Sequence, residues 1–108
     1  MTRLILKAVP VKLLDGVTAV AAGSTFALPV RASYLEWQAA YDVAPDAVNI
    51  TLRVSIDGVV WTILDTTTAT GGETRLATSP VGALFVDANV VTNTGGHKIT
   101  VTLVAKSN

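Results

Sequence analysis

The feature of this sequence that most constrains its fold is a hydrophobic period of two residues between closely spaced turn signals. Turn-forming pairs and clusters recur about every ten residues, as in β-sandwiches and β-barrels. Between them, residues 48–56 (VNITLRVSI) and 98–106 (KITVTLVAK) alternate apolar and polar side chains, the pattern of half-buried antiparallel strands. No stretch combines a helical period with helix caps. The sequence therefore predicts an all-β fold: an antiparallel β-sandwich, or a jelly-roll-like variant, of about 7–8 strands.

Three further segments are expected to form strands of the same fold. Residues 34–42 alternate in the same way, residues 83–91 do so more weakly, and residues 74–79 suit a short edge strand. In the segment 48–56, one face is expected to lie in the core. That face comprises Val48, Ile50, Leu52, Val54 and Ile56.

The chain is 108 residues long, the size of one domain, and we expect residues 15–108 to form a single β-sandwich. Residues 1–14 differ, because their apolar side chains fall on both faces of a strand. Pro10 cannot donate a hydrogen bond to a central ladder. Residues 1–14 are therefore either an edge strand of the same domain or an arm that pairs with a neighbouring subunit.

The charge composition argues against several classes of partner. Eight basic residues balance eight acidic ones, and only 15% of residues are charged. Nucleic-acid binding needs a basic patch, and an anionic membrane attracts a polybasic segment; the sequence has neither. No apolar run reaches the length of a membrane span, and Lys7, Pro10 and Lys12 interrupt the start, so we expect no signal peptide. The low charge indicates that some apolar surface faces another chain, which predicts a homo-oligomer.

The most specific local signal is a β-hairpin in residues 53–68 (RVSIDGVVWTILDTTT). Asp57-Gly58 separates two apolar runs, and this pair favours a two-residue type I′ turn. With that turn, Val54 would pair with Trp61, so Trp61 is expected in the core. A one-residue bulge would instead reverse one strand and place Trp61 outside.

The search for catalytic or metal-binding residues finds no strong candidate. His97 is the one histidine and lies in a turn-like GGHK stretch, and the chain has no cysteine. The acidic residues are scattered, and Asp42, Asp46, Asp65 and Glu73 lack the spacing of an EF-hand even if loops brought them around a calcium ion. We therefore expect no catalytic site, no cofactor, no metal and no enzymatic activity.

Residues 55–68 (SIDGVVWTILDTTT) resemble the S-x-D-G-x-x-W-T-x-L hairpin that is common in small β-sandwich proteins of tailed-phage virions. Residues 34–54 are similar to the segment before that hairpin, and residues 82–106 to its closing pair of strands, so the likeness covers roughly residues 17–108. It implies a small virion structural component, usually non-enzymatic and often oligomeric: a capsid decoration protein, a head or tail accessory protein, or a fibre-associated module. Of these we expect a capsid decoration or head accessory protein. Such a protein contacts the major capsid protein or another head or tail component, and its location is the virion.

The surface that would make these contacts is expected in two places. One is the N-terminal segment, with Leu4, Leu6, Val9 and Val11; the other is an outward patch on the hairpin, with Val60 and Leu64. The alternative function is a carbohydrate-binding β-sandwich module of a phage tail or fibre or of a secreted protein. That function would need exposed aromatic side chains, such as Tyr34, Trp37 or Tyr41, at one loop end.

Overall fold

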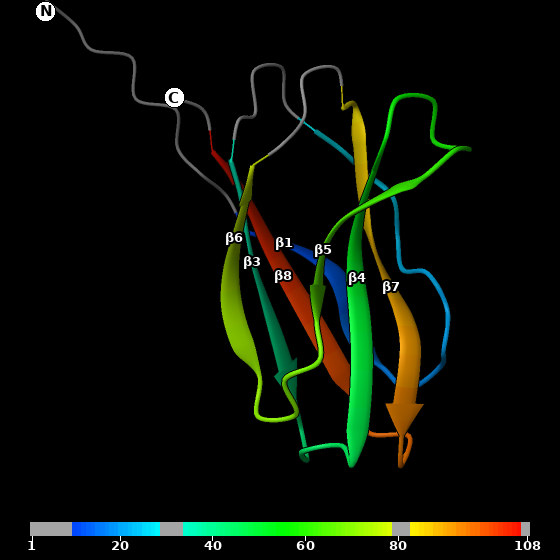
Figure 1. The fold of residues 1–108 in the computed structure, drawn as a ribbon, viewed down its shortest axis with the longest axis vertical. Helices are drawn as coiled ribbons and strands as arrows, with labels where there is room; N and C mark the ends of the chain where they lie inside the picture. The colour runs from blue at the N-terminus through cyan, green and yellow to red at the C-terminus, as the bar shows by residue number, and fades with distance from the viewer. Residues whose placement is uncertain (1–9, 29–33, 79–82, 107–108) are drawn as a thin grey trace, which may run out of the picture.

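The computed structural model describes residues 10–28, 34–78 and 83–106, and these form two antiparallel sheets packed as a β-sandwich (Figure 1). The strands are β1 (Val11–Val17), β2 (Phe26–Ala27), β3 (Tyr34–Tyr41), β4 (Ala47–Ser55), β5 (Thr62–Thr67), β6 (Glu73–Thr78), β7 (Phe85–Thr94) and β8 (Ile99–Lys106). One sheet has the order β1-β8-β3-β6 and the other β2-β7-β4-β5. The prediction of an all-β antiparallel sandwich of 7–8 strands is confirmed.

The core lies between the two sheets and follows from the alternation of apolar side chains. Val48, Ile50, Leu52 and Val54 of β4 are all buried, as predicted. They face the buried residues of the other sheet, which include Ile99, Val101 and Leu103 of β8 and Leu35, Trp37 and Ala39 of β3. Trp37 is 1% exposed and is the largest of the fully buried side chains. The tryptophan of the core is therefore Trp37.

The two ends of the sandwich differ in what they carry. At one end, β4 finishes at Ser55, β7 begins at Phe85 and β3 begins at Tyr34, whose partner in β8 is Lys106. We call this the hairpin end, because the connection between β4 and β5 lies here, at the upper end of the view in Figure 1. The opposite end carries the short connections from β3 to β4 and from β7 to β8.

Residues 11–17 form the edge strand β1 of the first sheet. Among the described strands, β1 pairs with β8 alone, and Val11 lies opposite Leu103, so β1 starts toward the hairpin end. Val11 is half-buried and packs against the core. β1 spans the boundary expected between residues 14 and 15. Leu4, Leu6 and Val9 lie outside the described residues, so the arm remains a prediction.

The predicted register of the β4–β5 hairpin is wrong. Val54 pairs with Thr62 and Arg53 with Ile63, and a bulge follows in β5, because Leu52 pairs with Asp65 and Leu64 is left as the extra residue. The connection is six residues long, from 56 to 61, instead of two. As a result Trp61 and Ile63 leave the core, and Leu64, expected outside, packs partly against it. Ile56, expected in the core, is 69% exposed.

Candidate functional site

The most prominent exposed apolar group of the hairpin end is the connection between β4 and β5. Its side chains Ile56, Val59 and Val60, which we call the apolar tip, are all strongly exposed; Val59 is 78% and Val60 70% exposed. Single exposed apolar residues are ordinary on a protein surface, whereas adjacent ones mark sites where another molecule binds. The apolar tip is therefore the candidate binding site of this protein.

The backbone of the apolar tip is fixed by the side chains of the hairpin motif. Oδ1 of Asp57 accepts hydrogen bonds from the backbone N–H groups of Val59 at 2.8 Å and Val60 at 2.9 Å. The Ser55 hydroxyl donates to the same oxygen and accepts from the N–H of Gly58. Gly58 has a φ of 79°, a conformation that a side chain would disfavour. The Ser, Asp and Gly of the motif thus build a wide turn in place of the two-residue turn that the sequence suggested.

The charge of Asp57 is stabilised by these same contacts. The N–H groups of Val60 and Val59 and the Ser55 hydroxyl lower the pKa of Asp57 below its ordinary value. A carboxyl group with a lowered pKa in the folded state contributes stability above its unfolded pKa. That contribution is lost as the pH falls through the lower, folded pKa.

We therefore expect the amide resonances of Val59 and Val60 to titrate with a midpoint below about 3.9, the ordinary pKa of an aspartate. The measurement is an NMR pH titration of these two amides between pH 6 and the onset of acid unfolding. The variant Asp57→Asn, which keeps a side-chain oxygen acceptor but cannot ionise there, should show no such titration. A midpoint at or above 3.9 in the unmodified protein would contradict the geometry of the turn.

Beneath the apolar tip lies a cleft of about 370 Å³. Its walls are mainly aliphatic, from Val54, Ile56, Val60 and Ala83, with Asp57 and Thr62 among its polar residues. A volume of this size is within the range of clefts that bind small ligands or inserted side chains. Because Asp57 already accepts three hydrogen bonds, the cleft offers mainly apolar contacts.

Trp61 connects the tip to the outer face of its sheet. The guanidinium group of Arg53 lies 5.1 Å from the centre of a Trp61 ring, within the range of a cation–π contact. Arg53 also donates two hydrogen bonds to the carboxylate of Asp87, at 2.9 Å and 2.6 Å. Asp87 is 2% exposed, and its hydrogen bond raises the pKa of Arg53. Arg53 thus contacts both Trp61 and Asp87, and the charges of Arg53 and Asp87 are paired with each other.

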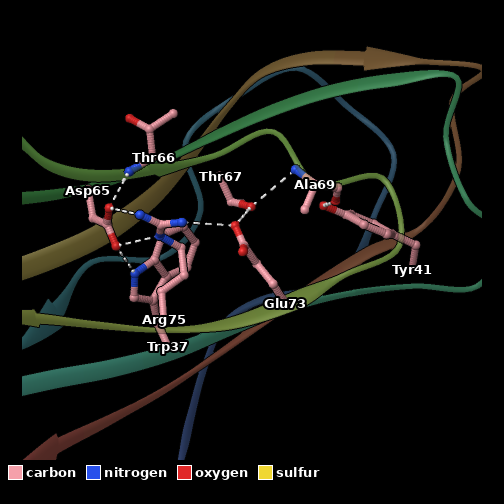
Figure 2. A network of polar contacts seen from close by, with 8 residues as sticks. All are labelled: Trp37, Tyr41, Asp65, Thr66, Thr67, Ala69, Glu73 and Arg75. Carbon is pink, nitrogen blue, oxygen red and sulfur yellow. Dashed lines mark hydrogen bonds and ion pairs between the residues drawn. The ribbon is translucent and has the colours of Figure 1, made fainter.

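A second polar network joins the two sheets where β5 lies against β6 (Figure 2). The carboxylate of Asp65 accepts from Nε1 of Trp37 at 2.9 Å, and from Nε and Nη2 of Arg75 at 2.8 Å and 2.9 Å. Glu73 accepts from Arg75 at 3.1 Å and from the Thr67 hydroxyl. Burial alone would raise the pKa of Asp65, but the hydrogen bonds from Arg75 and Trp37 lower it overall. The charged groups of this network therefore pair with one another. Because Asp65 lies on β5 and its partners Trp37 and Arg75 lie on β3 and β6, the network forms a clamp that links the two sheets.

The acidic residues considered for calcium are brought together only in part. Asp65 and Glu73 both contact Arg75, while Asp42, just after the end of β3, accepts from the N–H groups of Val43 and Lys98 instead. Within residues 10–28, 34–78 and 83–106, no group of three or more His, Cys, Asp or Glu side chains could hold a metal ion. The polar side chains of the described residues therefore define no metal centre.

The predicted interface and sugar-binding residues are placed as follows. Val60 is exposed in the apolar tip, while Val11 and Leu64 are half-buried against the core. Trp37 is buried between the sheets, and the Tyr41 hydroxyl donates to the carbonyl of Ala69 at 3.0 Å.

The sequence did not predict either of the two ion pairs, Arg53–Asp87 and Asp65–Arg75. The one signal for them in the sequence is that these charged residues fall within strand segments that are otherwise uncharged.

The fold and the site define a class of small antiparallel β-sandwich with an exposed apolar loop whose backbone is hydrogen-bonded to Asp57. Among solved structures, the crystal structure of the SPBc2 prophage-derived protein YomS is similar, with a TM-score of 0.70 and 13% sequence identity. The similarity covers 97% of this chain and 99% of that chain, and it shows a shared fold. No known protein family and no curated protein matches the sequence. Among the described residues, no helix has the length and hydropathy to cross a membrane.

Proposed function

We propose that this protein is a non-enzymatic structural protein of a phage virion, a capsid decoration or head accessory protein that acts through protein–protein contacts. The observation that carries the proposal is the end-to-end likeness to a prophage-derived protein, which leaves almost no part of either chain unmatched. The S-x-D-G-x-x-W-T hairpin supports it independently, because its likeness to virion proteins was found in the sequence alone.

The chemistry of the surface supports a binding role. The apolar tip is exposed and held by Asp57, so it presents a preformed apolar surface. The charged side chains of the two networks are occupied by one another. In this proposal the partners are the major capsid protein or another head or tail component, together with further copies of this chain. No cofactor, nucleic acid or membrane takes part.

The carbohydrate-binding alternative is less well supported by the arrangement of aromatic residues. Trp37, the largest aromatic side chain expected to contact a sugar, is 1% exposed. Tyr34 and Tyr41 are half-buried, and the Tyr41 hydroxyl is occupied by a backbone carbonyl. A sugar platform needs an exposed aromatic face, so these residues favour the structural role.

The test of the proposed function is the copy number of the protein in purified phage particles. Quantitative mass spectrometry should find hundreds of copies per particle, and cryo-electron microscopy should place them on the capsid. A few to a few dozen copies would overturn the decoration role and assign the protein to the tail, portal or fibre. Absence from the particles would overturn the virion role itself.

A further inference from the structure

We infer that the free edge of β6 pairs with β6 of a second copy, antiparallel and about a two-fold axis at Leu76, so that one sheet continues from copy to copy. The inference deepens the proposed function, on which its setting in a virion rests, by naming the surface between copies of the chain. The pairing itself is a property of the purified protein and can be measured apart from any particle.

β6 is an edge strand whose outward side chains are exposed. Among the described strands it pairs with β3 alone, and Figure 1 draws it at the left margin of the labelled strands. Its exposed residues alternate along the strand as Thr74, Leu76 and Thr78, and Leu76 is 65% exposed. An exposed leucine on a strand with one unpaired edge is the arrangement onto which a further strand can add.

The other three edge strands of the described sheets carry features that disfavour such pairing. β1 has two register shifts and the exposed charges of Lys12 and Asp15, β5 has a bulge, and β2 is two residues long. β6 instead matches β3 residue by residue from Glu73 to Thr78 without a shift, and none of its exposed side chains is charged. Because bulges, charges and short length are what keep natural sheet edges apart, β6 is the edge best suited to pairing.

The order of side chains along β6 indicates that the partner is a second copy. With the two-fold axis at Leu76, this residue faces Leu76 of the other copy, and Thr74 faces Thr78 of the other copy. Residues opposite each other in an antiparallel pair share a face and have Cβ atoms about 4.5–5.5 Å apart, so one Leu–Leu and two Thr–Thr contacts form. A two-fold interface requires a surface that complements itself in this way.

The charges of β6 are compatible with the same register. With the axis at Leu76, Arg75 faces Ala77 of the other copy, whereas an axis at Arg75 would set two like charges opposite each other. Arg75 is also held within its own copy, by Asp65 at 2.8 Å and 2.9 Å and by Glu73 at 3.1 Å. The clamp thus neutralises the charge of the strand and fixes its backbone before a partner binds, which lowers the entropy cost of pairing.

The size of the edge sets the expected strength of the dimer. The six residues of β6, at about 3.4 Å each, give an edge about 20 Å long. Across the roughly 10 Å between two sheets, contact of that length covers only about 200 Å² in projection, below the roughly 800 Å² per partner of a standard interface. We therefore expect a reversible dimer that dissociates on dilution and is strengthened where copies are held side by side.

The first test is sedimentation equilibrium of the full-length protein. Leu76→Lys places two like charges opposite each other at the axis, so it should weaken self-association by about tenfold or more. The matched control is Leu84→Lys, because Leu84 is also an exposed leucine, 50% exposed, but lies outside β6. The control should leave self-association unchanged. Both positions are exposed, so both variants should fold, which circular dichroism verifies.

A mixing experiment tests the two-fold register itself. Leu76→Glu alone should associate as weakly as Leu76→Lys, because like charges again meet at the axis. An equimolar mixture of the two variants should associate about tenfold more strongly than either variant alone, because opposite charges then face each other between copies. A merely structural effect of the substitutions would not be reversed by mixing.

Three results would overturn the inference. They are the absence of self-association by the unmodified protein up to about 1 mM, equal weakening by Leu76→Lys and Leu84→Lys, and a mixture that associates no more strongly than its components. The failure of the proposed function is distinguishable from these results. Absence of the protein from phage particles would leave the pairing of the purified protein in place, and absence of pairing would leave the copy number in particles unchanged.

Discussion

Replacing Trp37 by alanine should lower the free energy of unfolding by about 3–5 kcal/mol, the range for truncating a buried aromatic side chain. Trp37 is 1% exposed between the sheets, and its Nε1 donates to Asp65. The substitution would leave a cavity in the core and remove one contact of the clamp between β3, β5 and β6. A small domain has only about 5–15 kcal/mol of stability in total, so Trp37→Ala should be barely stable or unfolded.

The control for this prediction is the other tryptophan. Trp61 is half-buried on the outer face, where it contacts Arg53, so Trp61→Ala should cost only about 1 kcal/mol. Urea denaturation followed by circular dichroism measures both variants on the same scale. A larger loss for Trp61→Ala than for Trp37→Ala would support the two-residue hairpin register and contradict the observed one.

Replacing Arg53 by methionine should lower the free energy of unfolding by about 3–5 kcal/mol, because it leaves a buried carboxylate without its partner. Asp87 is 2% exposed, and both of its oxygens accept hydrogen bonds from Arg53. Arg53→Lys keeps the charge but cannot form the same pair of bonds, so it should lose less. The double variant Arg53→Met, Asp87→Leu should recover much of the loss, since it removes both charges.

The matched control for this prediction is the exposed pair Lys12–Asp15, whose side chains are 59% and 74% exposed. Lys12→Met should change the free energy of unfolding by less than about 1 kcal/mol. Denaturant unfolding of the unmodified protein, Arg53→Met, Asp87→Leu and the double variant gives the coupling energy of the Arg53–Asp87 pair by a double-mutant cycle. A coupling energy near zero would show that the pair does not stabilise the fold.

The part of the fold that was predictable from sequence is the part set by local alternation. In β4 and β8, apolar side chains recur at every second residue, so the buried face could be read directly. The order of strands in each sheet could not, because β3 pairs with β6 and β8, which are distant in sequence. Local period carries no information about such long-range partners.

The hairpin shows why a strong local signal can still fail. Asp-Gly favours a two-residue turn through backbone conformation alone, but the side chain of Asp57 also competes for the N–H groups of Val59 and Val60. The wider turn changes the register, and the bulge at Leu64 in β5 then restores the inward direction expected for Asp65 and the residues that follow it. The apolar tip was therefore found in the sequence only through Val60, and its two other members were assigned to other places or to none.

The sheet topology also has a kinetic consequence. Among the described strands, β4 and β5 are the only consecutive strands that pair with each other; every other ladder joins strands separated by at least one intervening strand. Chains with so many distant pairings typically fold in milliseconds to seconds, because long loops must close before those pairings form. The β4–β5 hairpin is thus the one ladder that can form early. The same short segment that carries the candidate binding surface is where folding of this chain can begin.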